Sequence, residues 1–142
     1  MPTFGPTSRK HLATCHGDIQ IIMSKVILIV DCSILEGHRS NTLQQEYFDR
    51  GLSQKGPGES KHNSTPSMAW HVMPYFKTKP HIDWTHWNSM YYLAGVIVAT
   101  AERLQLVGQI SHVVRSGLDW DRDGDVREKQ WNDGAHFELI SF

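Results

Sequence analysis

Cysteine is scarce in this chain of 142 residues, which holds only Cys15 and Cys32. Two cysteines are too few for the disulfide framework of a small secreted scaffold, and their spacing does not match a zinc knuckle. Neither lies in a recognisable Cys-His-Asn context. We therefore expect two free thiols that behave as small buried apolar residues rather than as nucleophiles.

An excess of positive charge is also missing. Fourteen Lys and Arg residues face fifteen Asp and Glu residues, which gives a formal net charge of −1. Proteins that bind nucleic acid or an anionic membrane surface carry a basic patch, and this sequence shows none. We predict no nucleic acid partner and no membrane partner.

Long apolar runs are absent as well. The two longest, at 19–30 and 90–101, fall short of the ~18 consecutive apolar residues that a bilayer span requires. The first residues, Met-Pro-Thr-Phe-Gly-Pro, show no charged segment followed by an apolar one, so no secretory signal is visible. We expect a soluble protein that accumulates in the cytoplasm of the cell that makes it.

The chain shows neither repeats nor low-complexity tracts, and its length suits one domain. Apolar spacing predicts helices at 18–31, capped by Asp18, at 41–50, capped by Ser40 or Asn41 and stopped by Gly51, and at 84–106. Strands are expected at 32–36, 69–73, 112–115 and 135–140, with a loop at 51–67. This irregular order predicts a single α+β domain over 1–142 without parallel βαβ units.

Histidine is unusually frequent, with nine residues. One of them, His136, lies in the last predicted strand, where alternation puts it on the same face as Glu138 and opposite Phe137 and Leu139. Two further histidines lie in the segments Ser60-Lys61-His62 and Ala69-Trp70-His71, and Asp133 stands three residues before His136. These segments form the sharpest cluster of chemically active side chains in the sequence.

These segments resemble the signature of the VanY-like and L-alanyl-D-glutamate endopeptidase family of phage and bacterial zinc peptidases. That signature is Ser-x-His, then Ala-x-Asp-x-x-Pro, then a late Asp or Glu-x-x-His. The element Gly37-His38-Arg39-Ser40, with Gln44 and Gly51, extends the resemblance over most of the chain. It implies the fold of the zinc DD-peptidases and hedgehog proteins, a small antiparallel sheet with flanking helices.

The resemblance also implies roles for individual residues. His62 and His136 are the expected zinc ligands, Asp133 the general base for the attacking water, and Arg39 the group that stabilises the oxyanion. Each role fits the chemistry of its side chain. Ser60 and Glu138 are expected to support the ligands, Glu138 by accepting the second N–H of a ligand imidazole.

The chain departs from the signature at His71, where the family has Asp. Imidazole is a competent zinc ligand, so a three-histidine site is chemically sound. Exchanging an anionic ligand for a neutral one raises the charge of the site by one unit, which lowers the pKa of a bound water and weakens the resulting nucleophile. The alternative is a His71 turned outward, which leaves two histidines.

The expected function is that of a zinc-dependent endolysin, a monomer that hydrolyses an amide bond of the peptidoglycan stem peptide, between L-Ala and D-Glu. The enzyme would lyse the host at the end of infection, reaching the wall from the host cytoplasm through a separate membrane-permeabilising protein. Two alternatives stay open. One is a D-alanyl-D-alanine carboxypeptidase on the same fold, and the other is an inactive wall-binding or structural module that results from the change at His71.

Two other patterns allow more than one interpretation. Trp84, Trp87 and Tyr91 lie at helical spacing, which favours core packing over a sugar-binding platform. The second pattern matches the first positions of an EF-hand calcium loop, but its twelfth position is Gln130 where the loop needs Glu, so weak calcium binding and an acidic surface turn are equally good interpretations. The candidate calcium ligands are Asp119, Asp121, Asp123 and Asp125.

Overall fold

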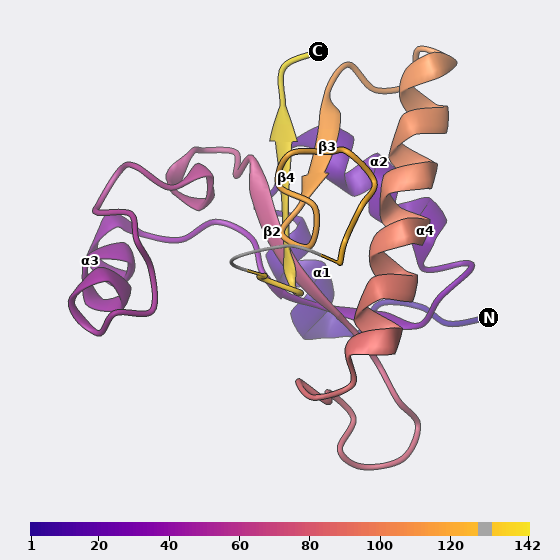
Figure 1. Ribbon diagram of the computed structural model, residues 1–142, viewed down its shortest axis with the longest axis horizontal. Helices are drawn as coiled ribbons and strands as arrows, with labels where there is room; N and C mark the ends of the chain where they lie inside the picture. Colours follow the sequence, from indigo (N-terminus) through magenta and orange to yellow (C-terminus); the bar gives the residue numbers. More distant parts are fainter. Residues whose placement is uncertain (128–131) are drawn as a thin grey trace.

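A four-stranded antiparallel sheet forms the centre of the computed structural model, which describes residues 1–127 and 132–142 (Figure 1). The strands follow the order β1-β2-β4-β3, so β2, which carries His71, and β4, which carries His136, lie side by side in the middle. Their bounds are β1 Cys32–Glu36, β2 Ala69–Pro74, β3 Val113–Ser116 and β4 His136–Ile140. The predicted α+β class is confirmed, and each predicted strand is present with bounds that differ by at most one residue.

Four α-helices and one short 3-10 helix accompany the sheet. They are α1 Pro6–Leu12, α2 Gly17–Val26, α3 Asn41–Asp49, η1 Lys61–Asn63 and α4 Trp87–Leu106. The prediction for α3 is confirmed: the Ser40 hydroxyl accepts a hydrogen bond from the Leu43 amide at 3.1 Å, and Gly51 follows with φ of 70°. Helix α1 was not predicted, and η1 lies inside the segment that we expected to be all loop.

The predicted cap of α2 is wrong. The imidazole of His16, not the Asp18 carboxylate, caps this helix by accepting a hydrogen bond from the Asp18 amide at 3.0 Å. Asp18 instead accepts hydrogen bonds from the Ser111 and His112 amides, both at 3.1 Å. A carboxylate near a helix N-terminus can cap its own helix or accept hydrogen bonds from another segment, and here Asp18 does the second.

Two other helix boundaries also differ from the prediction. Helix α2 ends at Val26 rather than near Asp31, and α4 begins at Trp87 rather than at Trp84. The imidazole of His86 caps α4. Trp84 is 56% exposed and Trp87 43% exposed, so the prediction that these side chains lie in the core is wrong.

The two faces of the sheet differ in chemistry. Trp70 of β2 stacks on Phe137 of β4 at 5.5 Å between ring centres, and both belong to the buried core formed with α2 and α4. Pairing of β2 with β4 sets His71 opposite His136 and Ala69 opposite Glu138. Since side chains alternate along a strand, His71, His136 and Glu138 share the face opposite Trp70 and Phe137. None of the described helices is long and apolar enough to cross a membrane.

Candidate metal centre and active site

His62 is held in place by its own short helix. The Ser60 hydroxyl accepts a hydrogen bond from the His62 amide at 3.2 Å, and the Asn63 side chain completes a capping box with Ser60. The Nδ1 atom of His62 lies 2.8 Å from the Gly37 carbonyl oxygen, to which it can donate. Ser60 therefore supports the site through the backbone, because it fixes the start of the short helix that carries His62.

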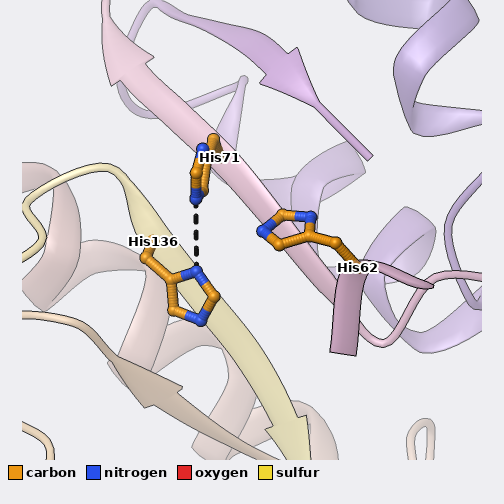
Figure 2. A group of neighbouring side chains, drawn as sticks. All are labelled: His62, His71 and His136. Carbon is orange, nitrogen blue, oxygen red and sulfur yellow. Dashed lines mark hydrogen bonds between the residues drawn. The ribbon is translucent and has the colours of Figure 1, made fainter. Parts of the chain in front are cut away.

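His71 and His136 meet across the sheet because their strands pair in register. His71 Nε2 and His136 Nδ1 are 3.2 Å apart, and Figure 2 shows the two rings pointing toward one another and toward His62. One ligand nitrogen from each of the three histidines lies within 4.8 Å of the other two. His71 thus points into the group and not away from it.

The hydrogen-bond partners of the ring nitrogens fit a metal ion bound by the three histidines. His62 Nε2 is buried and has no hydrogen-bond partner among residues 1–127 and 132–142. A buried polar atom without a partner is costly, and a metal ion would satisfy it. On the far side of the group, His136 Nε2 lies 2.9 Å from Glu138 Oε1. Ligand histidines in metal sites commonly have such a partner on the second nitrogen.

A cavity of about 420 Å³ opens over the three histidines. Asp133 and Arg39 also line it. Asp133 lies in the segment that leads into β4, where its amide donates to the Gly117 carbonyl at 2.9 Å and its carbonyl accepts from the His136 amide at 3.1 Å. These backbone contacts tie Asp133 to His136 and to Gly117, directly after β3.

Arg39 is 6% exposed, and its guanidinium group is held from several sides. It donates to Gln44 Oε1 at 2.8 Å and through Nε to Glu36 Oε1 at 3.0 Å, and it lies 4.7 Å from the centre of the Tyr47 ring. The predicted site residues, which lie far apart in the sequence, therefore line one cavity. They are Arg39, Ser60, His62, His71, Asp133, His136 and Glu138.

Three residues around the histidines were not predicted. Glu36 lies behind the histidines, and Arg115 donates to Glu138 Oε2 at 2.7 Å. Trp120 stacks on His136 with 5.3 Å between ring centres. Arg115 lies directly opposite Glu138 on the neighbouring strand, so the register of β3 with β4 could have indicated it, but no local motif marks either Trp120 or Glu36.

Burial and hydrogen bonds shift the pKa values at this site. Burial, together with the nearby His136, lowers the pKa of His62 to about 3, and burial also lowers the pKa of His71 well below its ordinary value. Burial alone would raise the pKa of Glu138, but hydrogen bonds from His136 and Arg115 lower it to about 2. His62 and His71 are therefore neutral near pH 7, the form that binds metal, and Glu138 is ionised.

The low pKa of His62 predicts that acid destabilises the metal-free protein. The unfolded histidine takes up a proton below its ordinary pKa of ~6.5, whereas the folded one does so only near pH 3. In excess chelator, the free energy of unfolding should therefore fall between pH 6.5 and pH 3, as measured by urea denaturation. His62→Gln should reduce this dependence. Equal stability of the parent at pH 7 and pH 4.5 would contradict the prediction.

Gly117 packs so closely on Asp133 that a side chain has no room. A Cβ atom at Gly117 would overlap the Asp133 carbonyl oxygen, which belongs to the backbone. We expect Gly117→Ala to displace Asp133, lower kcat more than metal affinity, and cost about 1–3 kcal/mol of unfolding free energy. Gly95→Ala is the matched control, because a Cβ atom there would have no atom within 4 Å other than those of its chain neighbours and of its own helix backbone. Unchanged turnover in Gly117→Ala would show that Asp133 needs no such placement.

The two cysteines are free and buried, as expected. Burial raises the pKa of Cys15 to about 11 and that of Cys32 to about 12. Because the thiolate is the reactive form, neither suits nucleophilic catalysis near pH 7.

The acidic loop after β3 gathers three of its predicted calcium ligands. Carboxylate oxygens of Asp119, Asp121 and Asp123 lie within 4.8 Å of one another, while the Asp125 carboxylate pairs with Arg127 at 2.7 Å. Gln130, the twelfth loop position, lies outside the described residues. Calcium binding stays a prediction, because an acidic turn has the same arrangement.

Comparison with known proteins agrees with this geometry. Residues 2–140 match the family described as phage L-alanyl-D-glutamate peptidase. The fold is similar to the crystal structure of the Serratia marcescens L-Ala D-Glu endopeptidase ChiX, with a TM-score of 0.73 and 22% sequence identity over 97% of this chain and 90% of that one. A search of curated proteins found no match. Since the family match spans nearly all of the sequence, the chain belongs to the phage L-alanyl-D-glutamate peptidase family.

Proposed function

We propose that this protein is a zinc-dependent peptidoglycan hydrolase that cleaves the amide bond between L-Ala and D-Glu of the stem peptide. The observation that carries the proposal is the meeting of three imidazole nitrogens, within 4.8 Å of one another, in a cavity also lined by Asp133 and Arg39. Membership of the peptidase family supports the substrate class.

The metal would be held by His62, His71 and His136. Three imidazoles suit Zn²⁺, and a zinc ion held there would polarise a carbonyl group and lower the pKa of a water molecule. The second nitrogen of His62 faces the Gly37 carbonyl and that of His136 faces Glu138, so both rings are oriented before any metal arrives.

The other residues act on the peptide and on protons. Asp133 takes a proton from the attacking water and passes it to the leaving amine, the ordinary work of a general base in amide hydrolysis. Arg39 is buried at the cavity with a fixed guanidinium group, suited to stabilise the negative charge that develops on the carbonyl oxygen.

The charge of the cavity lining matches an acidic peptide. Arg39, Lys55, Lys61 and Arg115 contribute positive charge to the lining, against the carboxylates of Asp133 and Glu138. The D-Glu residue of a stem peptide carries a free carboxylate next to the scissile bond. We propose that this cationic lining draws the substrate carboxylate into the cavity.

Digestion of purified cell walls tests the proposed function. New glutamate amino termini should appear with the parent protein, disappear with chelator and return with added zinc. Release of free D-Ala would instead show the carboxypeptidase. Wall binding without any new amino terminus would favour the inactive module. Zinc-independent cleavage would overturn the proposed cofactor.

Release to the wall through a separate membrane-permeabilising protein, for host lysis, is part of the same proposal, as is a monomeric state. The family description supports a phage enzyme whose substrate lies outside the host membrane. Accumulation of the protein in the host cytoplasm before lysis would agree with this route.

A further inference from the structure

Strand β1 contains an irregularity that turns one carboxylate toward the histidines. Ile34 pairs with Val72 of β2, but the next pair joins Glu36, not Leu35, with His71. Regular alternation would place Glu36 on the same face as Ile34, which is in the core. The extra residue shifts Glu36 to the opposite face, and bulges of this kind redirect side chains next to active sites.

The Glu36 carboxylate lies between two histidines of the group and Arg39. Its Oε1 atom is 3.7 Å from His62 Nδ1 and 3.8 Å from His71 Nδ1, and it accepts hydrogen bonds from Nε and Nη2 of Arg39. The Glu36 side chain is 15% exposed. A half-buried carboxylate in this place acts on the metal group and on Arg39 at once.

The proton positions of the three imidazoles give Glu36 its role. A neutral imidazole that offers one nitrogen to a metal carries its proton on the other nitrogen. For His62 that proton faces the Gly37 carbonyl, and for His136 it faces Glu138. For His71, Nε2 faces the group and Nδ1 faces Glu36. The Glu36 carboxylate lies 3.8 Å from this third proton position, too far for a hydrogen bond but close enough to act on it through its charge.

We propose that Glu36 is a positioning residue of the metal centre. Its carboxylate favours the His71 tautomer that presents Nε2 to the metal, and it fixes Arg39 at the cavity. It also places a carboxylate beside the three imidazoles, which restores a negative charge near the metal group in a chain that has His71 where the family signature has Asp. The inference rests on the metal site of the proposed function, but not on hydrolysis.

Zinc affinity, measured by competition with a chromophoric chelator, tests the proposal. Glu36→Gln keeps the shape of the side chain and removes its charge, and we expect it to bind zinc about 10–100-fold more weakly than the parent. Glu36→Asp should recover part of this loss. The matched control is Glu46→Gln, because Glu46 is on α3 with its side chain 57% exposed and pairs with Arg50. Its zinc affinity should equal that of the parent.

A positioning role also predicts a change in geometry. The visible spectrum of the Co²⁺-substituted protein should shift in Glu36→Gln and stay the same in Glu46→Gln. Arg39→Gln, which removes the other partner of Glu36, should bind zinc at least as tightly as the parent. If Arg39→Gln weakens zinc as much as Glu36→Gln, Glu36 acts only by packing and the proposal is overturned.

Two outcomes separate this inference from the proposed function. A parent protein that binds zinc but does not cleave walls overturns the function and leaves the role of Glu36 intact. A folded Glu36→Gln, checked by circular dichroism and thermal unfolding, with parental zinc affinity overturns the role of Glu36 alone. If Glu36→Gln fails to fold, the zinc affinities of Glu36→Asp and Arg39→Gln still decide, since parental affinity in Glu36→Asp with weakened affinity in Arg39→Gln contradicts the proposal.

Discussion

Replacing His62 or His136 by Ala should abolish zinc binding and peptidoglycan hydrolysis together. Each substitution removes one of three nitrogen ligands, and the two that are left cannot hold zinc against solvent in an open cavity. Metal analysis after gel filtration and release of amino termini from cell walls measure the two effects. Retained zinc at one ion per chain in either variant would contradict the ligand assignment.

Two control variants sharpen this experiment. His81→Ala removes a histidine that stacks on Tyr75 and does not line the cavity, and it should leave zinc and activity unchanged. His71→Asp introduces the acidic ligand of the family signature at the paired position on β2, and it should still bind zinc. Loss of zinc in His81→Ala would show that the assay responds to general damage instead of ligand loss.

Asp133→Ala should show the opposite pattern, with zinc retained and hydrolysis lost. Asp133 lines the cavity but does not belong to the group of residues that could hold the metal. We therefore expect its carboxylate to be available for proton transfer. A general base typically contributes ~10²–10⁴ in rate, and we expect kcat to fall by that factor. Zinc titration and wall digestion of the same preparation measure both quantities.

Glu138→Ala is the informative comparison for Asp133. Glu138 accepts from His136 and from Arg115, so its removal should weaken zinc binding as well as turnover. If Glu138→Ala, and not Asp133→Ala, separates retained zinc from lost turnover, the general base is Glu138. Full activity of Asp133→Ala would remove it from the mechanism.

The strands and helix α3 could be predicted because local patterns decide them. In β4, alternation places His136 and Glu138 opposite Phe137 and Leu139, and the buried core enforces that pattern in the folded chain. Ser40 and Gly51 act within a few residues of α3, so their effect is visible in the sequence. By contrast, Asp18 could cap its own helix or bind the distant Ser111 amide, and only packing decides between them.

The residue types of the site could be predicted from local motifs, since His62, His71, Asp133 and His136 stand in segments with short spacing. How these residues meet depends on the folded chain. The pairing of β2 with β4 turned His71 inward, and the irregular pairing of β1 with β2 brought Glu36 to the same face. Strand register and bulges depend on contacts between segments far apart in the chain, because no local propensity distinguishes one pairing of two apolar strands from its neighbour.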